Sequence, residues 1–234
     1  KKMNELGHEI RAFMPRFGII NERRHQLHEV IRLSGINVVI NDYDQPLIIK
    51  VASVPGAKIQ VYFIDNEEYF KRKGTWEDAQ GSFYDDNGAR SLFFSKSIIE
   101  TIKKLGWQPD VVHVMGWMSA PLPVYLRQFH SDDAHFAGTK VVYSLFENGF
   151  DGNLDKGLEE GMTFDGVQGM DQFTNPSAEA LFCGAARHAD AVLQMSPNAS
   201  PAAVEAAKAA GVPVHNGAEF LENPAALDAF YESL

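Results

Sequence analysis

Short apolar runs alternate with helix-like patterns along most of the chain, and this alternation limits the possible folds more than any other feature. Three of the runs, at 110–115, 140–145 and 191–195, contain no regular polar alternation. Such runs are typical of strands in a parallel sheet that is covered on both faces. Patterns with helical spacing lie between them, at 91–105 and 178–189. The order predicts an α/β fold with a Rossmann-like, doubly wound and mainly parallel sheet.

The first third of the chain adds a strand and a meander to this sheet. The run 9–14 ends at Pro15 and is expected to lie in the same parallel sheet as the three runs above. Three further apolar runs follow in close succession, at 36–40, 47–51 and 58–64. The turn-forming residues of 41–44 separate the first two, so these runs predict an inserted β-hairpin or antiparallel meander.

The remaining segments predict two more helices, a short strand and a long loop. A serine followed by proline opens an alanine-rich helix at 201–210, and an asparagine followed by proline opens a last helix at 224–231. A short strand at 212–214 lies between them. Residues 147–176 are rich in glycine, aspartate and phenylalanine, and they predict a long functional or mobile loop.

The net charge of −10 is unevenly distributed. Residues 1–150 hold 18 Lys and Arg against 18 Asp and Glu, whereas residues 151–234 hold 3 against 13. An acidic surface repels phosphates, so no nucleic-acid partner is expected. The acidic last third is better explained as a solvated face than as a surface for a basic partner, and both interpretations stay open.

Cysteine content and sequence motifs exclude several classes of protein. Cys183 is the single cysteine, which excludes an internal disulfide and a cysteine-based zinc site. No apolar run approaches the roughly 18 residues of a membrane span, so a cytoplasmic location with no membrane partner is expected. G-x-G-x-x-G, Walker, H-E-x-x-H and G-x-S-x-G motifs do not occur in the sequence. Neither a cofactor nor a metal is expected.

Two segments carry candidate site residues. His113 lies in an apolar strand that leads to Trp117, at the carboxyl end where α/β sheets bind ligands. A hydrogen-bonded core histidine explains His113 equally well. The segment before the helix at 91–105 holds three more polar candidates, Asp86, Asn87 and Arg90. For these residues a turn with a helix cap is the competing explanation.

Four stretches carry a resemblance to a known family. They are LGHEIRAFMPRF at 6–17, YDDNGAR at 84–90, GWQPDVVH at 106–113 and ADAVLQMSP at 189–197. In this order they resemble the N-terminal domain of bacterial glycogen synthases and plant starch synthases. Those enzymes are GT-B retaining glycosyltransferases of family 5, which extend α-1,4-glucan from ADP-glucose.

The resemblance implies half of a GT-B architecture, with residues 1–234 as a single Rossmann-like domain on the acceptor side. It also implies an α-glucan or a sugar nucleotide as the ligand. Residues that would bind the sugar or glucan are Asp86, Asn87, Arg90, His113 and Trp117. The second, nucleotide-binding domain of the family is expected to be absent from these residues.

The chain departs from the family pattern at positions that carry chemistry. Gly116 stands where the family has an aspartate, and Met118 stands where it has the active-site histidine. Asn148 follows Glu147 where the family has a histidine before the asparagine. The family's Lys-Thr-Gly-Gly-Leu loop, with the first strand that leads to it, is not found in the sequence, so the central strand of the sheet is expected to be absent or displaced. The chain alone is therefore expected to be inactive as a glucosyltransferase. Two alternatives stay open, a catalytic half that needs a separate partner chain and an acidic interaction module.

Overall fold

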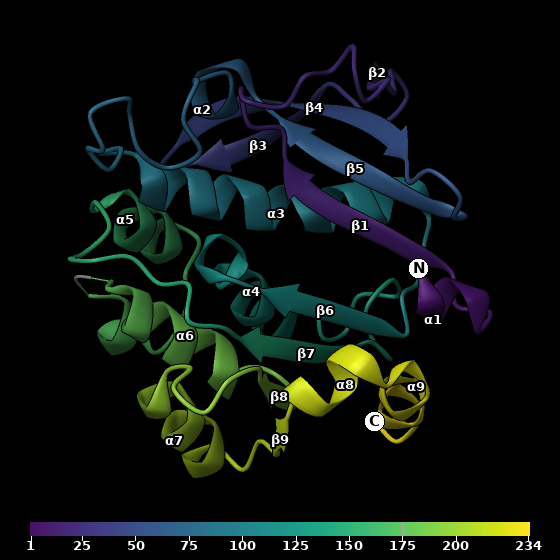
Figure 1. Cartoon of the computed structure of the whole chain (residues 1–234). Helices are drawn as coiled ribbons and strands as arrows, with labels where there is room; N and C mark the ends of the chain where they lie inside the picture. The colour runs from purple at the N-terminus through teal and green to yellow at the C-terminus, as the bar shows by residue number, and fades with distance from the viewer. Residues whose placement is uncertain (175) are drawn as a thin grey trace.

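The computed structural model describes residues 1–174 and 176–234, and its strands form two sheets (Figure 1). The first sheet consists of β1 (Ile10–Pro15), β2 (His28–Glu29), β3 (Ile36–Ile40), β4 (Tyr43–Ser53) and β5 (Ile59–Asp65). Strand β1 runs parallel to β5, while β5, β2 and β3 all pair with β4 in antiparallel fashion. Asn41 and Asp42 join β3 to β4 with φ angles of 50° and 65°, as a tight two-residue hairpin requires. The predicted antiparallel meander is confirmed.

The second sheet is entirely parallel, as the apolar runs predict. It consists of β6 (Val111–Met115), β7 (Lys140–Leu145), β8 (Ala191–Gln194) and β9 (Val214–Asn216), in that order. Strand β9 begins two residues later than the predicted strand at 212–214. The prediction that β1 shares one sheet with β6, β7 and β8 is wrong, because β1 and β6 are the end strands of separate sheets. A groove lined by both strands lies between them.

Helices cover both faces of the second sheet, which explains why its strands are apolar throughout. The helices that share the main core with Val141 and Tyr143 include α3 (Asn87–Leu105), α4 (Pro121–Phe129), α6 (Ala178–Arg187) and α7 (Pro201–Ala209). The opposite face, with Val142 and Leu193, packs against Phe230 of α9 (Pro224–Glu232). Short elements complete the fold, namely α1 (Lys2–Glu5), α2 (Glu67–Phe70), the 3-10 turn η1 (Trp117–Ser119) and α8 (Ala218–Glu222). Helix α3 also contacts β1, β3 and β5, so it joins the two sheets (Figure 1).

Residues 147–176 do not form the long loop that their composition predicts. The segment contains α5 (Gly157–Phe164) and η2 (Met170–Phe173), and Leu158, Met162 and Phe173 are buried in the main core. Its glycines explain the misleading composition. A Cβ atom on Gly161 would lie 2.4 Å from Leu92 of α3, so glycine here allows the two helices to approach closely. Among the described residues, no helix is both long and apolar enough to cross a bilayer.

Candidate functional site

His113 lies on β6, but its side chain points away from the other candidates. The hydroxyl of Tyr231 lies 2.5 Å from Nδ1, and the hydroxyl of Ser144 lies 2.7 Å from Nε2. Burial lowers the pKa of His113 from 6.5 to about 4, because the charged imidazole loses its hydration. Both ring nitrogens therefore serve a partly buried hydrogen-bond network between β6, β7 and α9 that favours the neutral imidazole.

Arg90 and Asn87 are fully buried at the start of α3. The Arg90 guanidinium donates from Nε to the Tyr69 carbonyl at 2.8 Å, from Nη2 to the Thr75 carbonyl at 2.6 Å, and from Nη1 to the Asn87 side chain. Asn87 in turn donates to the Trp76 carbonyl at 2.8 Å. Burial lowers the pKa of Arg90 from 12.5 to about 10. These contacts fix the connection between α2 and α3 and leave neither side chain open to a ligand.

Asp86 lies just before α3 and is only partly buried. Both of its carboxylate oxygens accept hydrogen bonds from the Arg72 guanidinium. The hydrogen bond to Asp86 raises the pKa of Arg72 above its ordinary value. The aromatic ring of Tyr84 lies 4.8 Å from the same guanidinium. The carboxylate is therefore paired within its own loop.

These positions are not those of a single site, as would be needed if the five sequence candidates together bound a sugar or glucan. His113 is in register with Val142, on the sheet face that α9 covers. Asp86 precedes α3, which packs on the opposite face with Val141 and Tyr143. The alternation of side chains along a strand places His113 on the wrong face for a shared site. Sequence spacing alone did not reveal which face the histidine occupies.

A tight turn follows β6 and shapes the carboxyl edge of the sheet. Gly116 has φ 81° and ψ 165°, a conformation open in practice to glycine alone. The Ser119 hydroxyl donates to the Met115 carbonyl at 2.8 Å, and the Ser91 hydroxyl donates to the Met118 carbonyl at 3.0 Å. Glycine at 116 is thus required by the backbone path, and Met118 is held at a fixed place under α3.

Four aromatic rings gather beside this turn and form what we call the aromatic cluster: Trp76, Phe83, Trp117 and Phe150. Trp117 lies at its centre and is 4% exposed, with ring centroids 5.0 Å from Phe150 and 6.0 Å from Trp76. Trp76 is 39% exposed and presents its indole to solvent. Trp117 therefore supports Trp76 from beneath, and Trp76 is the better placed ring for a ligand.

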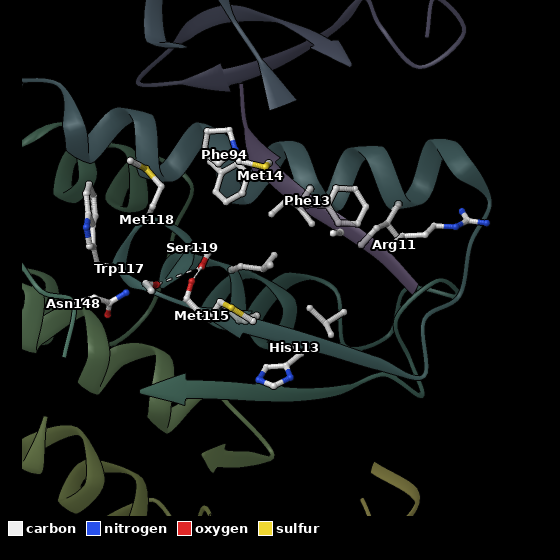
Figure 2. A pocket seen from close by; sticks show the side chains of 18 of the residues that line it. Arg11, Phe13, Met14, Phe94, His113, Met115, Trp117, Met118, Ser119 and Asn148 are labelled. Carbon is white, nitrogen blue, oxygen red and sulfur yellow. Dashed lines mark hydrogen bonds between the residues drawn. The ribbon is translucent and has the colours of Figure 1, made fainter. Parts of the chain in front are cut away.

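Asn148 follows β7 and is a polar neighbour of this turn that the candidate set did not include (Figure 2). Its side chain is exposed, and its Nδ2 would lie 3.4 Å from a Cβ atom on Gly116. The position after a parallel strand was the available signal, because such positions meet at the carboxyl edge of the sheet. Trp76 lies outside the helices and strands, so no strand position indicated the direction of its side chain.

The groove between the sheets has a volume of about 490 Å³ and runs from Arg11 to Asn148 (Figure 2). Its lining is apolar along most of its length, with Phe13, Phe94 and Met118 among the side chains drawn. Arg11 and His113 are the titratable residues among those that line it. The Arg11 guanidinium lies over the Trp107 ring at the amino end, away from the aromatic cluster. Among the residues that line the groove near the aromatic cluster, the side chains therefore offer stacking surface, the Asn148 amide and the Ser119 hydroxyl, and none of them is a carboxylic acid.

No metal centre is formed by the part of the chain that the structure describes, since no group of three or more His, Cys, Asp or Glu side chains is arranged to hold an ion. Cys183 is half-buried, and burial raises its pKa, which disfavours the reactive thiolate. The site is thus defined by shape and aromatic surface.

Comparison with known proteins identifies the family. Residues 1–208 match the sequence model described as the starch synthase catalytic domain. The glycogen synthase of Chlorobium limicola is 38% identical over 144 residues, covering 61% of this chain and 29% of that enzyme. The glycogen synthase of Chlorobaculum tepidum is 40% identical over 144 residues, covering 61% of this chain and 30% of that enzyme. The matched part therefore spans about 30% of the length of these relatives.

A solved structure shows the same fold. The catalytic domain of starch synthase IV from Arabidopsis thaliana, bound to ADP and acarbose, superposes with a TM-score of 0.66 at 13% identity. The match covers 94% of this chain and 47% of that one, so the fold corresponds to part of the GT-B glycosyltransferase fold of that enzyme. With the family model matched over residues 1–208, the chain belongs to the starch synthase catalytic domain family, which includes the bacterial glycogen synthases.

Proposed function

We propose that residues 1–234 form the acceptor-side domain of a glycogen or starch synthase-like glycosyltransferase. In this proposal the rim beside the aromatic cluster binds α-glucan or a sugar nucleotide, and the chain by itself does not transfer glucose. The family match and the ADP and acarbose bound to the starch synthase IV relative support the ligand class. A cytoplasmic location is part of the proposal, since the single cysteine leaves no need for an oxidising compartment.

The exposed indole of Trp76 is the observation that carries the binding proposal. Its ring lies at the carboxyl edge of the sheets, where α/β folds bind ligands, and Trp117 holds it from beneath. The apolar face of a sugar ring stacks on such an indole, and a nearby amide such as Asn148 hydrogen-bonds to hydroxyl groups. Asp86, Asn87 and Arg90 contribute indirectly, because they fix the loop that carries Trp76.

Arg11 and His113 are the titratable residues in the lining of the groove and neither faces the aromatic cluster, which supports the second half of the proposal. Glucosyl transfer with retention develops positive charge on the sugar and negative charge on the departing diphosphate. Both charges need oriented polar or charged groups in a site that excludes water. Met118 supplies no charge, and Gly116 cannot be exchanged for aspartate without strain at φ 81°. This chain alone therefore lacks the groups that the reaction needs.

Binding of maltoheptaose, followed by titration calorimetry or tryptophan fluorescence, tests the ligand. We expect Trp76→Ala to weaken binding by about tenfold, which corresponds to the loss of one stacking contact. Tyr43→Ala is the matched control, because Tyr43 is an aromatic side chain that is 72% exposed at a distant hairpin. Equal affinity of the two variants, or no binding by the unaltered chain, would contradict the proposed glucan site.

Transfer from ADP-glucose to glycogen, measured with the purified chain, tests the absence of activity. We expect no turnover above background, and we expect the double variant Met118→His with Gly116→Asp to remain inactive. Turnover by the unaltered chain, free of contaminating synthase, would contradict the proposal. Turnover that appears on mixing with a second polypeptide would instead identify a catalytic half that works with a partner chain.

A further inference from the structure

The outermost strand of the second sheet, β9, has a free edge. In the part of the chain that the structure describes, β9 pairs with β8 alone (Figure 1). The Pro213 carbonyl accepts a hydrogen bond from β8 at 2.9 Å, and the Gly217 N–H donates one to β8 at 2.8 Å. Peptide groups alternate in direction along a strand, so the odd-numbered positions face β8. Val214 and Asn216 therefore turn their N–H and C=O groups outward.

A groove of about 380 Å³, which we call the β9 groove, lies along this edge. Val204 and Lys208 of α7 line it on one side, and Ser196 lines it after the end of β8. Val204 is 8% exposed and Val214 is partly buried against the main core, so both offer apolar contact. Asn216 is exposed. The β9 groove thus combines outward peptide groups with an apolar strip that solvent can reach.

Carboxylates surround the β9 groove. Three glutamates each bind a residue that lines it: Glu147 binds Ser196, Glu205 binds Lys208 and Glu219 binds Asn216. Lys208 is the single Lys or Arg within residues 191–234, against five Asp and Glu. A carboxylate accepts more than one hydrogen bond, so all three glutamates can take further donors. The groove therefore favours a cationic occupant and repels an anionic one.

An end strand of the first sheet shows what a closed edge looks like. Strand β3 pairs with β4 alone, and the Lys96 ammonium donates to the Val39 carbonyl of β3 at 2.8 Å. Charged side chains placed in this way protect sheet edges from pairing with another chain. Within residues 1–174 and 176–234, no side chain donates to the outward carbonyls of Val214 and Asn216 in the same manner. The edge of β9 is open to a further strand.

We infer that the edge of β9 binds an extended, basic segment of a partner protein, which adds to the second sheet as a strand. The main chain of the segment pairs with Val214 and Asn216, and its apolar side chains contact Val204. Its Lys and Arg side chains reach the three glutamates. Strand addition of this kind takes affinity from main-chain hydrogen bonds and specificity from side chains. The inference gives the acidic last third of the chain a role and does not depend on the proposed glucan site.

Amide hydrogen exchange of the unaltered chain tests the inference, with a capped peptide of about seven alternating lysine and valine residues as the probe. We expect the peptide to slow exchange at Val214 and Asn216 by at least about tenfold, since these amides gain hydrogen bonds. The His215 amide is the internal control, because its peptide group already faces β8. Slowing that is equal at all three positions, or absent from Val214 and Asn216, would overturn the inference.

Two matched peptides separate charge from strand pairing. In the first, glutamate replaces every lysine, and we expect no binding because the groove is ringed by carboxylates. The second keeps the lysines but carries N-methyl groups on alternate amides, which remove the donors that pair with β9. We expect it to lose the protection of Val214 and Asn216. Equal protection by either peptide would overturn the inference.

Variants of the protein locate the charges. We expect Glu205→Gln with Glu219→Gln to weaken binding of the lysine–valine peptide by about threefold to tenfold, and the difference should shrink in high salt. Glu29→Gln with Glu68→Gln is the matched control, because it changes the net charge equally at two exposed glutamates outside the second sheet. Equal affinities of the two double variants would overturn the inference. Protection of Val214 and Asn216 that depends on protein concentration without any peptide would also overturn it, because a second copy would then occupy the edge.

Discussion

At the scale of single residues, Arg90 shows how a charged side chain can act as a structural brace. Its guanidinium is fully buried and lies between the rings of Phe70 and Tyr84, 5.3 and 5.2 Å from their centroids. Two backbone carbonyls and Asn87 accept its hydrogen bonds. Burying a cation is costly unless its N–H donors are satisfied. The buried Arg90 guanidinium is therefore stable only while all of its hydrogen-bond acceptors are present.

Replacement of Arg90 by methionine should therefore lower the free energy of unfolding by about 3 kcal/mol or more, because two buried carbonyls lose their donor. Arg72→Met is the control, since the ion pair of Arg72 with Asp86 is 30% and 25% exposed and its loss should cost about 1 kcal/mol or less. Urea denaturation measures both. Equal stability of the two variants would mean that Arg90 is not a structural brace.

The lowered pKa of the partly buried His113 predicts a specific dependence of stability on pH. Its pKa is about 4 in the folded protein and 6.5 as a model value, so the unfolded chain binds the proton more tightly between these values. The free energy of unfolding should fall as the pH drops from about 6.5 to about 4, by up to about 3 kcal/mol from this residue. His113→Gln does not titrate, and it should lack this part of the acid sensitivity. Parallel slopes for both proteins in urea denaturation would contradict the prediction.

The polar candidates were visible in the sequence, but their roles were not. The sequence left His113 open between a ligand and a core residue, and it left 84–90 open between a site and a turn. The folded environment decides both cases, because the partners lie elsewhere in the chain: Tyr231 of α9 for His113, and the carbonyls of Tyr69 and Thr75 for Arg90. Trp76 and Asn148 lie on loops, where no periodic pattern indicates which way a side chain points.

At the scale of helices and strands, one carboxylate organises the contact between α3 and α5. Asp155 accepts the N–H of Gly88 at 2.6 Å and the N–H of Gly157 at 2.8 Å, so it caps the first turns of both helices. Gly88 leaves room for this, because a Cβ atom there would lie 2.9 Å from both the carboxylate and the Leu158 nitrogen. The cap fixes where α5 begins against α3.

Loss of this cap should loosen α5 without unfolding the sheets. We expect Asp155→Ala to cost about 1–2 kcal/mol and Asp155→Asn to cost less, since asparagine keeps an oxygen acceptor. Limited proteolysis should cleave the segment around α5 faster in the alanine variant. The exposed Asp151 provides the control, and Asp151→Ala should behave like the unaltered chain. An unchanged cleavage rate for Asp155→Ala would contradict the role of this carboxylate.

The element pattern of the chain was predictable where local signals agreed with burial. The parallel strands, the meander and the helices at α3, α6, α7 and α9 follow the apolar periods and caps. The structure of residues 147–176 was not predictable in this way. Glycines that permit close helix packing give this segment the composition of a loop. The division into two sheets was not predictable from periodicity, since pairing between strands is a property of the whole fold.

At the scale of the whole molecule, the last helix binds the first and closes one face of the second sheet. Nε2 of His8, after α1, lies 2.5 Å from Oδ1 of Asp228 in α9. Phe230 packs against Val142, Ala191 and Leu193, and it is 7% exposed. Because the next residue, Tyr231, hydrogen-bonds to His113, the docking of α9 controls how far the histidine is removed from water.

Phe230→Ala should therefore weaken the docking of α9 and change the titration of a histidine on another element. Removal of a buried phenylalanine ring costs about 3–5 kcal/mol where the cavity does not collapse. We expect detachment of α9 to return the pKa of His113 from about 4 toward 6.5, as measured by NMR titration of its ring signals. Leu221→Ala in α8 is the control, because Leu221 is 67% exposed and should leave both stability and titration unchanged. A His113 pKa that stays near 4 in a variant whose α9 amides exchange freely would show that the sheet itself, and not α9, excludes water from this histidine.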